Sequence, residues 1–144
     1  MTATAEFQLQ TAVDPLNILE LTNVLVSSFQ NKASENKSFF VNEISAQLYL
    51  DTNPQMFSCV FRGLLSVITC AARDSCIRLT SKTYGKMILL QVKDSNSLNP
   101  GCISGELQKL HSIAERMKGS VEVTSQRRNL TTITFGFPNL SCAN

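Results

Sequence analysis

The sequence has little of what marks several specialised classes of protein. It contains no tryptophan and one histidine among 144 residues, and its formal net charge is only +2. A charge that small gives no reason to expect nucleic acid or an anionic membrane surface as a partner. The single histidine, His111, would have to meet distant thiols to form a Cys/His metal site. We therefore expect no metal centre, no nucleic acid and no membrane as a partner.

The five cysteines do not form a disulfide pattern. Their number is odd, no two have Cys-x-x-Cys spacing, and residues 1–6 show no basic region followed by an apolar run. Free thiols and a cytoplasmic location are the expectation. The longest dense apolar stretch, residues 59–72, is interrupted by Arg62 and Gly63. It is also shorter than the roughly 20 residues that span a bilayer.

What the chain does have is the composition of an ordinary folded domain. Hydrophobic residues make up 43% and charged residues 17% of it. A chain of this length is near the usual size of one domain and buries enough surface for a core of its own. We divide it into a loose N-terminal tail over residues 1–14, one domain over 15–138 and a C-terminal tail over 139–144.

Capping residues and apolar spacing predict two helices in the first half. Asp14 and Pro15 are typical of a helix start, and an imperfect apolar stripe follows them to about residue 30. Asn53 precedes the most regular helical pattern of the chain, which runs to about residue 72. Between the helices, the polar residues 31–37 predict a turn, whereas two short apolar segments at 38–44 and 48–50 predict strands.

The second half predicts four strands and one helix. A hairpin is indicated by alternating residues 76–83, a turn and the continuous apolar run 87–92. After a loop over 94–103, Ser104 would cap a helix with Glu106 in its first turn, and Gly119 would end it. Two further strands, 121–124 and 131–137, close the chain.

This order of elements predicts an α/β (α+β) two-layer sandwich. Strands joined by tight turns favour a mixed, largely antiparallel sheet. About three helices, each with one apolar face, would cover one side of that sheet.

Four segments resemble the ATPase domain of the GHKL group, which comprises histidine kinases, gyrase-type topoisomerases, Hsp90-type chaperones and MutL-type repair proteins. Residues 50–66 resemble the helix that carries the family's asparagine motif, and residues 88–94 resemble the strand that ends in its adenine-binding aspartate. Residues 107–123 and 130–138 resemble the last helix and the closing strands. The segments are most similar to the histidine kinase branch, which implies a role in bacterial two-component signalling.

The resemblance implies particular residues that hold Mg²⁺ and adenine. The asparagine that holds Mg²⁺ corresponds to Val67, and the preceding helix-face asparagine corresponds to Gly63. Neither side chain offers the oxygen ligand that Mg²⁺ needs. Asp94 stands in the place of the adenine-binding aspartate, but an aspartate followed by Ser95 and Asn96 also forms a turn with its own backbone. Both interpretations of Asp94 stay open.

The family's glycines and its lid are also altered. Asn96 and Leu98 replace the two glycines that follow the aspartate, and Leu98 would crowd the base pocket. The stretch up to residue 103 is too short for the glycine-rich lid that lays backbone N–H groups on the phosphates.

At the lid helix, Glu106 stands where the family has a phosphate-facing glycine. Its carboxylate would compete for the N–H groups of the first turn and repel a triphosphate. Gly101 and Gly105 remain and would allow a residual anion site. Thr131 and Thr132 correspond to the threonine of the family's closing strand.

These departures lead to three hypotheses. The first is a degenerate domain without catalytic residues or cofactor. It would bind a kinase hairpin, a receiver domain or a sigma factor through its first helix and the loop 95–103. Whether the chain forms a homodimer is left open. The second is a working stand-alone kinase, for example of the anti-sigma type, that uses ATP and Mg²⁺. The third is a vacated pocket, made more apolar by Val67, Leu98 and Ile103, that holds another small ligand. His111 is expected on the helix flank rather than as a phosphoacceptor.

Overall fold

A computed structural model describes residues 16–96, 101–127 and 130–139 of the chain. Its elements follow in the order β1 (Leu16–Asn17), α2 (Ile18–Ser27), α3 (Gln30–Glu35), β2 (Phe39–Asn42), β3 (Tyr49–Leu50), α4 (Pro54–Ala71), β4 (Cys76–Tyr84), β5 (Met87–Asp94), α5 (Gly101–Glu115), β6 (Ser120–Arg127) and β7 (Leu130–Pro138).

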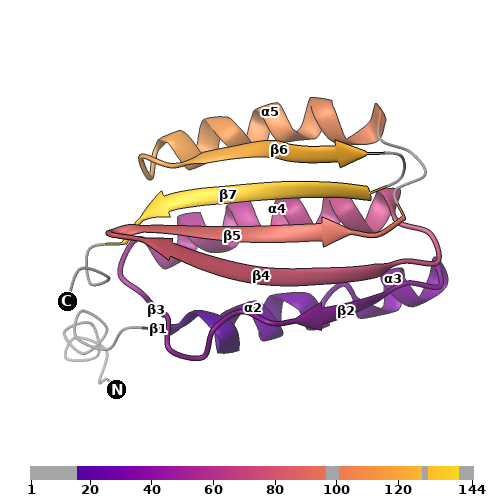
Figure 1. Ribbon diagram of the computed structural model, residues 1–144, viewed down its shortest axis with the longest axis horizontal. Helices are drawn as coiled ribbons and strands as arrows, with labels where there is room; N and C mark the ends of the chain where they lie inside the picture. The colour runs from indigo at the N-terminus through magenta and orange to yellow at the C-terminus, as the bar shows by residue number, and fades with distance from the viewer. Residues whose placement is uncertain (1–15, 97–100, 128–129, 140–144) are drawn as a thin grey trace, which may run out of the picture.

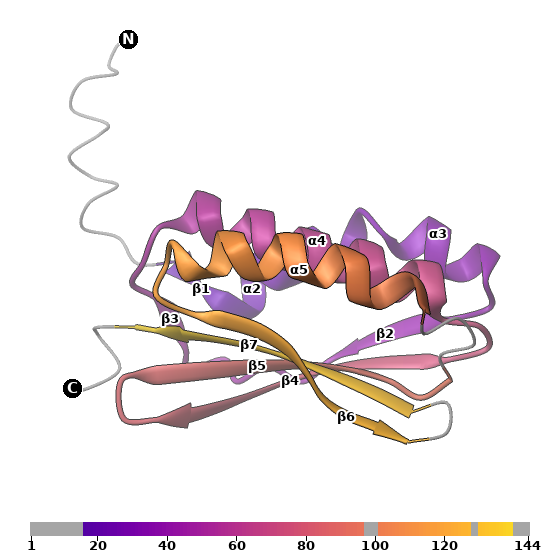
Figure 2. The same cartoon turned by 90° about the horizontal axis from the view of Figure 1, so that it is seen from above.

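Five of the strands form one mixed sheet with the order β2-β4-β5-β7-β6 (Figure 1). β2 runs parallel to β4, and the other three pairings are antiparallel. β1 and β3 form a separate two-stranded ladder. The helices lie on one side of the five-stranded sheet (Figure 2). The predicted two-layer α+β sandwich with a mixed, largely antiparallel sheet is therefore confirmed, with four helices among the described residues where about three were expected.

The central helix α4 forms as its sequence predicts. Asn53 Oδ1 accepts the backbone N–H groups of Gln55 and Met56, at 2.9 and 3.1 Å, and Pro54 occupies the first turn. Phe57 and its apolar neighbours at helical spacing are buried. The ring of Phe57 lies 5.6 Å from that of Phe137, in an edge-to-face arrangement typical of aromatic cores.

By length and composition alone, α4 would also pass as a membrane-spanning helix, which the sequence analysis did not expect. Half of its length is buried within the domain, where it packs against α2 and α5. The apolar surface of α4 is accounted for by this core packing.

Two predictions for the N-terminal region are wrong. The first helix begins at Ile18 and not at Pro15, because β1 pairs with β3 and holds Leu16 and Asn17 extended. Asn17 is the actual cap, since its Oδ1 accepts the N–H of Glu20 at 3.0 Å. The polar segment predicted as a turn contains helix α3, whose one buried residue, Ala33, anchors it. Asp14 and Pro15 lie outside the described residues.

The ends of α5 also differ from the prediction. The helix begins at Gly101, three residues before the predicted cap Ser104, so Glu106 lies in its second turn. After the helix, Lys118 and not Gly119 takes the left-handed conformation, with φ of 64°. Gly119 is required for another reason: a Cβ there would overlap the carbonyl oxygen of Gly136.

At the C-terminal end, the domain extends one residue beyond Pro138. Asn139 is 1% exposed, and its side chain joins two distant segments. Its Oδ1 accepts the N–H of Asp51 at 2.6 Å, and its Nδ2 donates to the carbonyl of Tyr49 at 2.8 Å. The sequence analysis placed Asn139 in the tail, but it packs with the domain.

Candidate functional site

The structure separates the predicted site residues into two groups. Gly63, Val67 and Glu106 meet at a cavity between α4 and α5. Asp94 and Thr131 lie opposite each other at one end of β5 and β7. The described lining of the cavity does not include either residue of the second group.

The cavity has a volume of about 200 Å³. Its lining residues are Gly63, Ser66, Val67, Cys70, Glu106 and Leu110. Small-molecule sites usually measure roughly 300–1,000 Å³, so this space is small for a nucleotide. The Ser66 hydroxyl, the Cys70 thiol and the Glu106 carboxylate are its polar side-chain groups. Within the described ranges, no three His, Cys, Asp or Glu side chains gather as a metal site would require.

The cavity is small because α5 packs directly on α4 at Gly63. A Cβ added there would overlap Cδ2 of Leu110 and lie 3.1 Å from its Cδ1. Leu110 and Val67 are both more than 90% buried. The surface of α4 at Gly63 is thus covered by a leucine side chain of α5.

Glu106 lies in the second turn of α5, whereas the sequence predicted it in the first turn. Its predicted effect on a bound phosphate stays a prediction. The side chain is 58% exposed and lies 3.7 Å from Lys109 Nζ. Such an exposed ion pair contributes little to stability. Glu106 therefore places a solvated negative charge at the rim of the cavity.

Asp94 is fully buried at the end of β5 and takes part in a polar network. Its Oδ1 accepts hydrogen bonds from the hydroxyl of Ser75 and from the backbone N–H of Asn96, the latter at 3.0 Å. The bond from Asn96 closes a turn between the Asp94 side chain and the following backbone, as one of the two interpretations of the sequence predicted. Asn96 is held in addition by Arg73, whose N–H donates to the Asn96 carbonyl at 3.2 Å.

The two threonines of β7 lie on opposite faces of the sheet, because side chains alternate along a strand. Thr131 is 1% exposed and faces the helices beside Asp94, and no described residue is a hydrogen-bond partner of its Oγ1. Thr132 pairs with Lys93 on the other face. The structure thus brings Thr131, but not Thr132, to Asp94.

The remaining candidates fall at the start of α5. Gly101 is the first residue of that helix, and Gly105 is exposed with open space around it. Leu98 lies outside the described residues, so its predicted place in the base pocket stays a prediction. The same is true of the side chain of Ile103.

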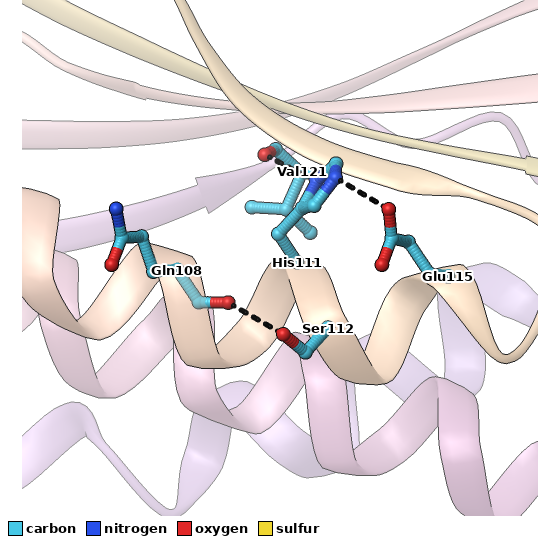
Figure 3. A network of polar contacts seen from close by, with 5 residues as sticks. All are labelled: Gln108, His111, Ser112, Glu115 and Val121. Atoms are coloured by element: carbon cyan, nitrogen blue, oxygen red, sulfur yellow. Dashed lines mark hydrogen bonds and ion pairs between the residues drawn. The ribbon is translucent and has the colours of Figure 1, made fainter.

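His111 lies on the flank of α5, as expected, and links the helix to β6 (Figure 3). Its Nδ1 accepts the backbone N–H of Val121 at 3.1 Å, and its Nε2 lies 3.3 Å from Glu115 Oε2. The Nδ1 contact therefore joins α5 to β6, whereas the Nε2 contact lies within α5.

Sequence reasoning missed several residues of both groups. Ser66 and Cys70 could have been found, because they follow Gly63 at helical spacing and so share a face of α4. Ser75 and Leu110 carried no such signal. Ser75 lies 19 residues before Asp94, and only the antiparallel register of β4 and β5 brings the two together.

Comparisons with known proteins give matches of structure only. No family model and no curated protein sequence matches the chain. Among solved structures, the Acinetobacter baumannii histidine kinase AdeS matches with a TM-score of 0.74 at 10% identity, over 88% of this chain and 66% of AdeS. The cytoplasmic segment of histidine kinase QseC matches with a TM-score of 0.66 at 15% identity, over 88% of this chain and 78% of the segment.

The histidine kinase ThkA matches in two forms. Its isolated catalytic domain gives a TM-score of 0.71 at 16% identity, over 88% of this chain and 95% of the domain. ThkA solved in complex with the response regulator protein TrrA gives a TM-score of 0.71 at 17% identity, over 95% of this chain and 49% of the kinase chain. This chain thus spans about two thirds of AdeS and about half of that ThkA chain, and it has the fold of the histidine kinase catalytic domain.

Proposed function

We propose that this domain is a degenerate relative of the histidine kinase catalytic domain, which binds a signalling protein in the bacterial cytoplasm and does not hydrolyse ATP. The observation that carries the proposal is the contact between Gly63 and Leu110, which brings α5 onto α4 where a nucleotide-binding domain needs space. The cavity that is left has Val67 and Leu110 as walls. Neither side chain can hold Mg²⁺ or accept a hydrogen bond.

The structure of ThkA with a response regulator supports a receiver domain as the partner class. A kinase hairpin and a sigma factor are the other candidate classes of partner. The proposed contact surface comprises α2, where Val24 is 65% exposed, together with the segment 95–103, whose last three residues belong to α5.

A thermal-shift titration with Mg·ATP and Mg·ADP tests the proposal. A ligand at 100 times its dissociation constant stabilises a protein by about 2.7 kcal/mol, which is readily measured. We expect no shift at millimolar nucleotide. A saturable shift with either nucleotide would refute the non-catalytic role.

The alternative function is a working ATP-dependent protein kinase with an unusual nucleotide site. One specific observation favours it: the buried Thr131 hydroxyl lies beside Asp94 and has no hydrogen-bond partner among the described residues. Under this alternative, Thr131→Val and Asp94→Asn would each weaken the nucleotide-dependent thermal shift. A control substitution at Thr132, on the opposite face, would leave that shift unchanged.

A further inference from the structure

The sheet has one face without a helix over it in the described part of the chain. α2, α3, α4 and α5 all lie on the other side (Figure 2). We call the uncovered side of the three central strands the open face. The strand register and the alternation of side chains assign to it Arg78, Thr80, Lys82 and Tyr84 of β4, Met87, Leu89, Gln91 and Lys93 of β5, and Thr132, Thr134, Gly136 and Pro138 of β7.

The charges on the open face all have the same sign. Arg78, Lys82 and Lys93 are its ionisable cations, and none of its twelve residues is acidic. Arg78 and Lys93 stand directly opposite each other in the antiparallel ladder, an arrangement that disfavours like charges. Two acidic residues border the open face. Glu43 lies 3.6 Å from Arg78 Nε, and Glu122 of β6 stands opposite Thr134 on the same side of the sheet.

Uncharged polar side chains form the next row of the open face. Thr80 and Gln91 are directly opposite each other, and among the described residues neither Thr80 Oγ1 nor Gln91 Oε1 has a hydrogen-bond partner. Gln91 Nε2 donates to Thr134 Oγ1 at 3.4 Å, a long contact. Both unpaired oxygens are covered by the domain itself, so a bound segment would contact the side chains around them and not these atoms.

Apolar side chains lie at the hairpin end of the same face. Tyr84 is 61% and Met87 36% exposed. The two are opposite each other, next to the Gly85–Lys86 turn. They offer a contact for an aromatic or aliphatic side chain beside the positively charged rows.

We propose that the open face binds an acidic, extended segment of the partner protein. The inference rests on the proposed binding function. It adds a second contact surface, on the side of the sheet opposite α2, and names the chemistry of the segment that this surface binds. Arg78 and Lys82 are four residues apart on one strand, so their Cα atoms lie about 13 Å apart. Carboxylates at positions i and i+4 of an extended segment have the same spacing. A second copy of this chain is a poor occupant, because two open faces would bring like charges together.

NMR chemical-shift mapping with the intact, ¹⁵N-labelled chain tests this proposal, with a capped peptide of ten glutamates as the probe. We expect shift changes on β4 and β5 around Arg78, Thr80 and Lys93, and little change on α4 and α5. The double variant Arg78→Gln/Lys93→Gln should weaken binding about fivefold, since two exposed ion pairs are lost. The matched control Lys109→Gln/Arg116→Gln removes the same charge from α5 and should bind as the unmodified chain does.

Three outcomes would overturn the proposal. They are shift changes confined to the helices, equal weakening by the two double variants, and tighter binding of a ten-nucleotide oligo-dT than of the peptide. The last would assign the face to nucleic acid. Each is distinguishable from failure of the proposed function, because nucleotide binding would instead shift the amides of residues 94–96 and 131. A dispersed spectrum of each variant verifies that it is folded.

Discussion

Leu110 lies against the backbone of Gly63, so closely that a Cβ at position 63 would overlap its Cδ2 atom. This contact decides how near α5 comes to α4 and how small the cavity beside it is. Gly63 is therefore needed for a close approach, although glycine in the interior of a helix costs about 1 kcal/mol relative to alanine.

Gly63→Ala should change stability with opposite signs in two backgrounds. In the unmodified chain, overlap with Leu110 costs about 1–3 kcal/mol, which exceeds the gain in helix propensity. In a Leu110→Ala chain the overlap is gone, so Gly63→Ala should raise the free energy of unfolding by about 1 kcal/mol. Urea denaturation of the four proteins measures both changes. Equal effects in the two backgrounds would show that the contact does not matter.

Asp94→Asn should destabilise the domain by about 1–3 kcal/mol, because the amide brings N–H donors into a buried place where a carboxyl oxygen accepts two hydrogen bonds. The bonds concerned come from the Ser75 hydroxyl and the Asn96 N–H. Asp74→Asn is the matched control. Asp74 is exposed with φ of 49°, a conformation that asparagine tolerates, so its change should stay within about 0.5 kcal/mol. If thermal unfolding gives the two variants the same stability, the hydrogen bonds of Asp94 do not contribute to the stability of the domain.

The neutral imidazole of His111 should carry its proton on Nε2. The backbone N–H of Val121 is a fixed donor, so Nδ1 must accept, and Nε2 then faces the carboxylate of Glu115 as a donor (Figure 3). Long-range ¹H–¹⁵N spectra above the imidazole titration report the tautomer directly. A spectrum of the Nδ1–H form would mean that His111 donates to the carbonyl of Val121 instead, which lies 3.2 Å away.

Asn139→Ala should lower the free energy of unfolding by about 2–4 kcal/mol, because it leaves the N–H of Asp51 and the carbonyl of Tyr49 without their partner. The control is Asn31→Ala on the exposed side of α3, which should have almost no effect. Chemical denaturation of both variants provides the comparison. If the Asn139 variant is as stable as the control, the side chain of Asn139 does not stabilise the domain and the residue belongs to the predicted tail.

The elements that the sequence predicted well are those with strong local patterns. Asn53 and Pro54 followed by a regular apolar stripe indicated α4, and alternation about the Gly85 turn indicated the β4–β5 hairpin. The errors lie where partners distant in the chain decide. Pairing with β3 keeps Leu16 extended, and one buried alanine, Ala33, anchors a helix in a segment that is otherwise polar.

The candidate site shows the same division. The absence of an oxygen ligand at Val67 follows from the residue itself, because no fold gives a valine a lone pair. The positions of the Glu106 and Thr132 side chains do not follow from residue type. The position of Glu106 depends on the helical turn in which it lies, and that of Thr132 depends on the face of the sheet to which it points.

The sequence by itself determined the layered α+β fold and the absence of an oxygen ligand at Val67, since periodicity and side-chain type are local properties. Only the tertiary structure decided that Leu110 fills the space over Gly63, that Ser75 bonds to Asp94 and that three cations share one uncovered face. These relationships come from helix packing and strand register, which join residues from distant parts of the chain and leave no spacing in the sequence to mark them.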